Sequence, residues 1–234
     1  MYLLPFPILG GLLAWATIYS LGFDKQRWGE FVLGLAAFFI AIIIQNPVQQ
    51  LPLLGVGIKS NADIIARGTA FTVGVSIWLG LIAGIAQEGA KYLLVKGKSL
   101  NTGLFLGLGF GITEVFVIAG AALAGALATG EPLDVPLSAA LASMVERYFV
   151  VLFHVGTGIY LAYAYREGYG RTGLLAMIGI HTVIDSMAAY YQLTKSTPVM
   201  YAVEFITALV ALGLLYHTIP KAKLELPEEE AALW

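Results

Sequence analysis

The sequence contains no cysteine among its 234 residues. Disulfide bridges, thiolate metal sites and a cysteine nucleophile are therefore excluded for this chain. Charge is scarce as well, because Lys, Arg, Asp and Glu make up only 12% of the residues and the net charge is -2. Such a small charge balance gives no electrostatic basis for binding nucleic acid, so we expect no nucleic-acid partner.

Apolar residues dominate the composition instead. Hydrophobic side chains make up 59% of the chain, and the mean hydropathy is +0.81, which is more than a water-soluble domain of this size could bury. Uncharged apolar runs long enough to cross a hydrocarbon core of roughly 30 Å recur along the whole sequence. A signal peptide followed by a soluble domain is therefore not expected. We expect an integral protein of a prokaryotic cell membrane, with the lipid bilayer as its surroundings.

The apolar runs predict an all-α, polytopic membrane helix bundle of about seven transmembrane helices, within a range of six to eight. Backbone groups in lipid must be satisfied within each segment, which a helix achieves. The expected spans are residues 2–22, 29–45, 69–95, 101–128, 138–165, 172–193 and 198–218. After the second span, Pro47, Pro52, Gly55 and Gly57 predict a loop that leads into a short interfacial helix near 58–67.

We expect a single transmembrane bundle over residues 1–220, with a motif-bearing core at 69–193, and a charged cytoplasmic tail at 221–234. Basic residues in alternate loops predict the orientation, since they are enriched on the cytoplasmic side. Loops on the C-terminal side carry Lys25, Arg27, Lys96, Lys98, Arg166, Arg171, Lys221 and Lys223. The other side carries only Lys59, Arg67 and Lys195. The sequence therefore predicts an outside N-terminus and a cytoplasmic C-terminus.

Ionisable residues also occur inside the apolar spans. A charge at the bilayer centre costs at least ~3 kcal/mol on insertion scales, so each such residue needs a partner or has a task. At a helical rise of ~1.5 Å per residue, five of them fall in one layer about 6 Å thick. These five are Glu88, Glu114, His154, His181 and Asp185. The same count puts Glu146 and Arg147 near the outer rim, as a structural pair, while Glu204 has no partner at helical spacing and is expected to be structural.

Spacing along the helices predicts two interacting pairs. Glu88 and Lys91 are three residues apart and His181 and Asp185 are four apart, so each pair shares a helix face. Lys91 would keep Glu88 ionised. Asp185 would fix the tautomer of His181 and aim the other ring nitrogen into the bundle.

A second pattern is structural. Gly103, Gly107 and Gly111 recur at four-residue spacing and predict a smooth stripe on the helix that carries Glu114. Such stripes let membrane helices approach closely. We expect this stripe to bring Glu114 against a neighbouring helix.

Four short motifs contain these residues: Gln87-Glu88-Gly89-Ala90-Lys91, Phe110-x-x-x-Glu114, Glu146-Arg147 followed by Phe153-His154, and His181-x-x-x-Asp185-Ser186. Their order and spacing over residues 87–186 resemble the YhfC and PrsW families of intramembrane proteases, which are related to the CAAX prenyl-protein endopeptidase clan. The resemblance implies a glutamic-type endopeptidase that cleaves a membrane protein or a membrane-associated peptide.

The resemblance also implies roles for individual residues. The catalytic set would be Glu88, Glu114, His154, His181 and Asp185, in which a glutamate activates water and a histidine stabilises the developing oxyanion. The supporting set would be Gln87, Lys91, Phe110, Glu146 and Arg147. The sequence departs from the family pattern at Gln87, which stands where the first glutamate of a pair is usual and where the clan has its general base. Either Glu88 or Glu114 has taken over that role, or this chain is slow or inactive.

The glutamic mechanism requires no cofactor, and the sequence has no His-Glu-x-x-His motif. If a divalent metal such as zinc is used, its nitrogen and oxygen ligands would be Glu114, His154, His181 and Asp185. Two other functions stay open. Buried Glu, Asp and His also form the relays of ion- or proton-coupled transporters, although no internal repeat typical of transporter halves is present. A catalytically inactive membrane scaffold of the same fold is the third alternative.

Overall fold

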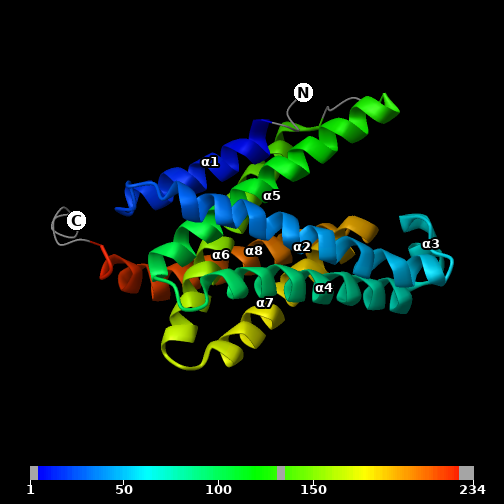
Figure 1. Ribbon diagram of the computed structural model, residues 1–234. Coiled ribbons are helices and arrows are strands. Elements are labelled where there is room, and N and C mark those ends of the chain that lie inside the picture. Colours follow the sequence, from blue (N-terminus) through cyan, green and yellow to red (C-terminus); the bar gives the residue numbers. More distant parts are fainter. Residues whose placement is uncertain (1–4, 131–134, 227–234) are drawn as a thin grey trace.

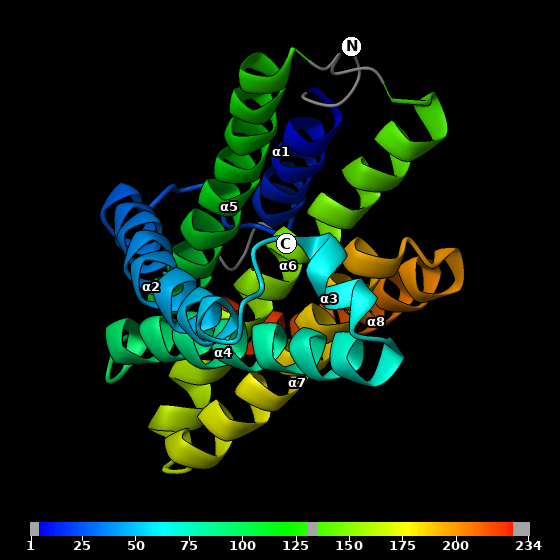
Figure 2. The ribbon, with the colours of Figure 1, turned by 90° about the vertical axis from the view of Figure 1, so that its right-hand side faces the viewer.

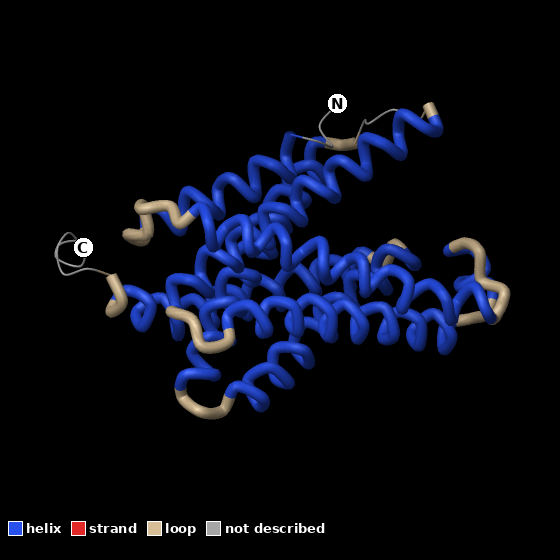
Figure 3. The backbone as a smooth tube through the Cα atoms, in the orientation of Figure 1, coloured by secondary structure: helices blue, strands red, loops and turns tan. Residues whose placement is uncertain are grey.

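The computed structural model describes residues 5–130 and 135–226, and within these ranges the chain is helical with no strand (Figures 1 and 3). This confirms the predicted all-α bundle. The helices are α1 (Pro5–Ser20), α2 (Trp28–Gly55), α3 (Asn61–Ala66), α4 (Thr69–Val95), α5 (Leu100–Thr129), α6 (Leu137–Arg166), α7 (Gly170–Thr194) and α8 (Thr197–Lys223).

Six helices of the described chain are long and apolar enough to cross a membrane, namely α2, α4, α5, α6, α7 and α8. Helix α1 has 16 residues, which is short of the about 20 that a hydrocarbon core requires. It nevertheless packs against α5 and α6 (Figure 1). The first of the seven predicted spans is therefore a shorter helix, and the number of full-length spans lies at the lower end of the predicted range.

Helix α2 is longer than predicted. It continues past residue 45 to Gly55, with Pro47 and Pro52 inside it, because a membrane helix tolerates proline where neighbouring groups satisfy the freed backbone. The loop predicted from residue 46 onward is wrong up to Gly55. The interfacial helix predicted near 58–67 is present as α3, which begins with a capping box between Ser60 and Asp63.

The glycine stripe of α5 faces α6, as predicted. A Cβ atom on Gly103 would overlap the backbone oxygen of Gly158, and one on Gly107 would overlap the backbone oxygen of His154. The two helices therefore approach to backbone contact. This contact holds Glu114 of α5 beside the face of α6 that carries His154.

The helices form two groups that diverge toward one end of the molecule. Helix α4 packs mainly on α7, while α5 packs on α6, and α2 and α8 join the two groups through contacts with α5 and α6. Figures 1 and 2 show α1, α5 and the first half of α6 leaning away from α2, α4, α7 and α8 where α5 ends and α6 begins. The predicted site residues lie where the groups are still in contact.

The chain after α8 is docked rather than solvated. One carboxylate oxygen of Glu225 accepts a hydrogen bond from the backbone N–H of Leu100 at 2.6 Å, and the other accepts one from Arg166 at 2.6 Å. A carboxylate suits this position because the first N–H groups of α5 have no partner within the helix. Within the predicted tail, residues 221–223 thus belong to α8 and Glu225 contacts α5 and α6, while residues 227–234 lie outside the described residues.

Candidate active site

Lys91 of α4 lies fully buried at the centre of the polar cluster. Its ammonium nitrogen is 2.7 Å from Oε1 of Glu88, 2.6 Å from Oγ1 of Thr157 and 3.1 Å from Nδ1 of His154. An ammonium has three N–H donors and no acceptor. All three donors therefore have a partner, and Lys91 joins α4 to α6.

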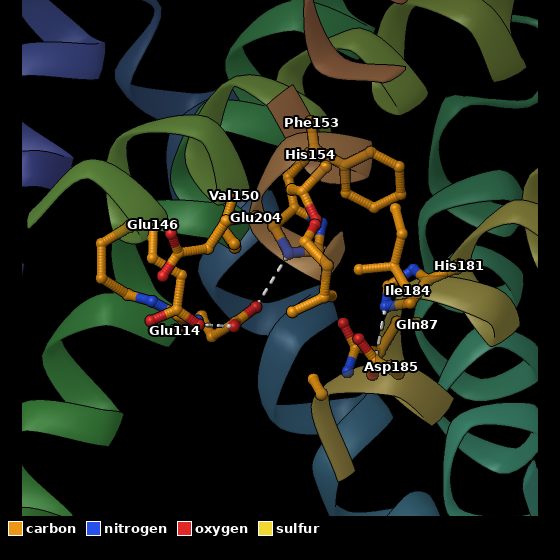
Figure 4. A pocket seen from close by; sticks show the side chains of 14 residues that line it. Gln87, Glu114, Glu146, Val150, Phe153, His154, His181, Ile184, Asp185 and Glu204 are labelled. Atoms are coloured by element: carbon orange, nitrogen blue, oxygen red, sulfur yellow. Dashed lines mark hydrogen bonds and ion pairs between the residues drawn. The ribbon is translucent and has the colours of Figure 1, made fainter. Parts of the chain in front are cut away.

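These contacts determine the tautomer of His154. Because the Lys91 ammonium only donates, Nδ1 of His154 is the acceptor and the ring hydrogen resides on Nε2. That Nε2–H points to Oε2 of Glu114 at 2.8 Å (Figure 4). Both ring nitrogens of His154 are thus engaged, one by a cation and the other by a carboxylate.

His181 of α7 lies between two carboxylates. Its Nδ1 is 2.6 Å from Oε1 of Glu88, which is itself completely buried. Its Nε2 is 3.5 Å from Oδ2 of Asp185, longer than the usual 2.7–3.2 Å of a protein hydrogen bond. The predicted pairing of Asp185 with His181 is therefore loose, and the tight partner of the ring is Glu88.

Glu114 has a donor on each carboxylate oxygen. Besides His154, it accepts a hydrogen bond on Oε1 from Nη1 of Arg147 at 2.9 Å. Arg147 also contacts Glu146 at 2.5 Å through Nη2. The expected pair of Glu146 and Arg147 is therefore present, and the Arg147 side chain, only 12% exposed, also reaches from α6 to the Glu114 carboxylate.

Two aromatic rings enclose the charged groups. The Lys91 nitrogen lies 5.1 Å from the ring centroid of Phe110 and 5.7 Å from that of Phe153. The Phe110 ring also packs against the His154 ring at 4.8 Å between centroids. Rings at these distances attract the cation and keep water away from the pairs, which strengthens the electrostatic contacts between them.

A cavity of about 60 Å³ lies beside the polar cluster. This volume is enough for more than one water molecule. Figure 4 shows Glu114 and Glu146 on one side of it and His181, Gln87 and Asp185 on the other, with His154 between them. Its lining residues are Gln87, Glu114, Glu146, Arg147, Val150, Phe153, His154, His181, Ile184, Asp185, Ala188, Val203, Glu204 and Thr207.

The small cavity shares walls with two wider clefts. A cleft of about 440 Å³ between α2, α4, α5 and α7 shares Gln87, Glu114 and Asp185 with it. A cleft of about 500 Å³ between α6, α7 and α8 shares Glu146 and Glu204 with it. Both clefts extend toward the end of the bundle where α2 and α7 finish and α6 begins. A ligand in either cleft would contact residues that also line the small cavity.

Most of the predicted site residues lie close together, but only some of them line the cavity. Glu114, His154, His181, Asp185, Gln87, Glu146 and Arg147 line the cavity. Glu88, Lys91 and Phe110 do not line it and lie behind its wall. The two candidate bases therefore differ in position, because Glu114 lines the cavity and Glu88 does not.

Two residues of the site were missed or misjudged from the sequence. Thr157 accepts a hydrogen bond from Lys91, and its spacing of three from His154 was a usable signal for a shared helix face. Glu204 of α8, expected to be structural, lines the cavity. Only the packing of α8 on α6 and α7 places it there, and no sequence spacing reveals that packing.

Residues 132–207 match the model of a family described as YhfC intramembrane metalloprotease. The match covers about one third of the chain and confirms, over that segment, the resemblance inferred from the motifs. It includes His154, His181 and Asp185, whereas Glu88 and Glu114 precede it. No curated protein and no solved structure matches the chain.

The family description implies a metal ion, which His, Asp and Glu side chains would have to bind. Within residues 5–130 and 135–226, no three His, Asp or Glu side chains come together in an arrangement that could hold a metal ion. The ring nitrogens of His154 are both taken, and the Lys91 ammonium already sits against Glu88. Catalytic zinc takes three protein ligands around one point. The donors in this structure do not fit that arrangement.

Proposed function

We propose that this integral membrane protein, whose segment 132–207 matches the YhfC family, is an intramembrane endopeptidase that hydrolyses a peptide bond of a membrane protein or membrane-associated peptide. The observation that carries the proposal is the position of Glu114. Its carboxylate is oriented by His154 and Arg147. It lines the cavity of about 60 Å³, which shares lining residues with two wider clefts.

In the proposed reaction Glu114 is the general base. It accepts a proton from a water molecule in the cavity while the water oxygen bonds to the carbonyl carbon of the substrate. The electron pair of the carbonyl double bond moves onto its oxygen, which receives a hydrogen bond from Nε2–H of His181; the ring is doubly protonated in this step because its Nδ1–H is used on Glu88. The C–N bond then breaks, and the proton held by Glu114 passes to the leaving nitrogen. The products are a carboxyl group and an amine.

Glu88 and Lys91 support this reaction from behind the cavity wall. Lys91 holds His154 in the tautomer that donates to Glu114, and Glu88 holds the ring of His181. A shell of this kind keeps the reacting groups in place, so that little reorganisation is needed when charge develops. Their contribution is positioning, and we assign neither residue direct contact with the substrate. The proposed mechanism requires no metal ion.

The test is cleavage of single-span reporter peptides by purified protein in lipid vesicles, read by mass spectrometry of the products. We expect cleavage by the wild type and a loss of about 10²- to 10⁴-fold in kcat for Glu114→Gln, the usual contribution of a general base. Glu167→Gln is the matched control, because Glu167 lies in the exposed α6–α7 turn. A wild type that cleaves no reporter, or a Glu114→Gln variant that cleaves as well as the wild type, would contradict the proposal.

One observation supports a second candidate, a proton-coupled transporter. Close polar contacts run from His181 through Glu88, Lys91 and His154 to Glu114, and Asp185 lies 3.5 Å from His181 at one end. Such a string could pass protons between carboxylates. Proton flux into sealed vesicles that Glu114→Gln abolishes, without any peptide cleavage, would favour this candidate. Absence of both activities, with normal folding, would favour an inactive scaffold.

A further inference from the structure

Three glutamine side chains form a line between α2 and the active-site cavity. Nε2 of Gln49 donates to the backbone oxygen of Leu79 at 2.6 Å. Nε2 of Gln45 lies 3.5 Å from Oε1 of Gln49, and Nε2 of Gln87 donates to Oε1 of Gln45 at 3.1 Å. The line therefore starts at a main-chain carbonyl of α4 and ends at Gln87, beside the cavity.

The first contact sets the direction of every amide in the line. A backbone carbonyl can only accept, so Gln49 must turn its NH₂ group to Leu79 and its oxygen to Gln45. Gln45 then turns its NH₂ group to Gln49 and its oxygen to Gln87. Gln87 consequently uses its NH₂ group on Gln45 and has its carbonyl oxygen left over. The orientation of the last amide thus follows from a main-chain group three contacts away, and the middle contact, between Gln45 and Gln49, is the longest at 3.5 Å.

The remaining oxygen of Gln87 has no hydrogen-bond partner in the described structure, although the residue is only 6% exposed. Gln87 lines both the small cavity and the cleft of about 440 Å³. A buried acceptor without a donor is unfavourable, so a donor from outside the protein is expected at this oxygen.

We propose that Gln87 binds the substrate by accepting a hydrogen bond from a backbone N–H of the peptide, next to the bond that is cut. This inference rests on the proposed function and deepens it. An amide is no base at neutral pH, so the glutamine found where the family pattern has a glutamate serves in binding and not in proton transfer. Gln45 and Gln49 are positioning residues that keep the acceptor facing the cavity.

The rest of the cleft suits the same ligand. Besides Gln45 and Gln49, its wall carries the uncharged amides of Asn46, Gln50 and Gln192. Amide side chains both donate and accept, which matches the alternating groups of a peptide backbone. Most N–H groups of a helix are used within the helix, whereas those of an extended segment are free. The substrate class is therefore a peptide segment that enters the cleft in extended form.

The experiment is a cycle between protein and peptide variants, with a cleavable reporter peptide and versions methylated at single backbone nitrogens near the cleavage site. In the wild type we expect methylation at one position to raise KM by about tenfold, the loss of roughly one hydrogen bond. In Gln87→Met, which lacks the acceptor at similar size, the unmodified peptide already shows the raised KM and the methylation adds nothing. Gln87→Glu retains acceptor oxygens and retains the sensitivity to methylation.

The positioning residue is tested separately. Gln45→Lys offers Gln87 only donors, so it should turn the Gln87 amide and reproduce the KM of Gln87→Met with an unchanged kcat. Gln45→Glu keeps an acceptor toward Gln87 and loses only the donor to Gln49, so its KM should stay below that of Gln45→Lys. Gln26→Met is the matched control, because Gln26 lies between α1 and α2 and does not line this cleft.

Equal sensitivity to methylation in the wild type and in Gln87→Met would overturn the inference while the protease assignment stands. The same cycle is also measured as equilibrium binding of fluorescent peptides to the protein in vesicles. That measurement decides the role of Gln87 even where no cleavage occurs, and absence of cleavage alone counts against the proposed function. A Gln87→Met variant that binds the unmodified peptide as tightly as the wild type would exclude the hydrogen bond.

Discussion

Nε2 of His154 lies 2.8 Å from Oε2 of Glu114, a residue 40 positions earlier in the chain. The two side chains come from α6 and α5, whose glycines allow the helices to touch backbone to backbone. The glycine stripe of α5 and the contact between Glu114 and His154 are therefore linked. The closeness of α5 and α6 is what makes Glu114 and His154 one unit beside the cavity.

Replacement of the buried Lys91 by an uncharged residue should destabilise the protein strongly. Lys91→Met leaves the Glu88 carboxylate completely buried without its ion-pair partner, for an expected loss of about 3–5 kcal/mol in unfolding free energy. The double variant Glu88→Gln with Lys91→Met removes both charges and should recover part of the loss. Unfolding by denaturing detergent, followed by circular dichroism, measures both. A single variant as stable as the wild type would contradict this account of the pair.

Closing the gap between α5 and α6 should weaken both folding and activity. In Gly107→Ala the new methyl group meets the backbone oxygen of His154, and the helices must move apart, at about 1–3 kcal/mol. Gly120→Ala is the matched control on the same helix, since nothing lies within 4 Å of its Cβ position. The control should be neutral or stabilising by up to about 1 kcal/mol. Equal effects of the two substitutions on thermal unfolding would show that α5 does not depend on this contact.

Protein purified without a metal-affinity step should contain far less than one zinc ion per chain. The physical reason is the pairing of the donors, since His154 and Glu88 are occupied by Lys91 and Glu114. Cleavage should survive dialysis against a chelator. Zinc near one per chain by elemental analysis, lost in Glu114→Gln and in His181→Ala, would overturn this expectation and support the family description of a metalloprotease.

The clefts should open toward the outside of the cell. Basic loop residues predict that the α4–α5 loop is cytoplasmic and that α3 is external. Because the chain has no cysteine, Ser60→Cys and Lys98→Cys each create a single thiol for labelling. In intact cells an impermeant maleimide should label Ser60→Cys, and Lys98→Cys only after permeabilisation. The reverse pattern would invert the predicted orientation and place the mouth of the clefts in the cytoplasm.

Much of the site could be predicted because the spacing of residues along a helix shows which of them share a face. Glu88 and Lys91 were expected to pair from their spacing of three, and they do. The catalytic roles stay predictions. Spacing within one helix carries no information on contacts between helices, and so it missed the bond from Arg147 to Glu114, the place of Glu204 at the cavity and the line from Gln49 to Gln87.

By itself the sequence determined the solvent and the class of fold, because hydropathy and helical hydrogen bonding are local properties that each apolar run carries on its own. It also predicted a common depth for several carboxylates and imidazoles. Only the tertiary structure decided which of them line a cavity. Glu88 and Glu114 are the same residue type in different surroundings. The packing of α4 against α6 and α7 buries Glu88 behind Lys91 and His181. Glu114 lies where the helix groups begin to diverge and lines a cavity.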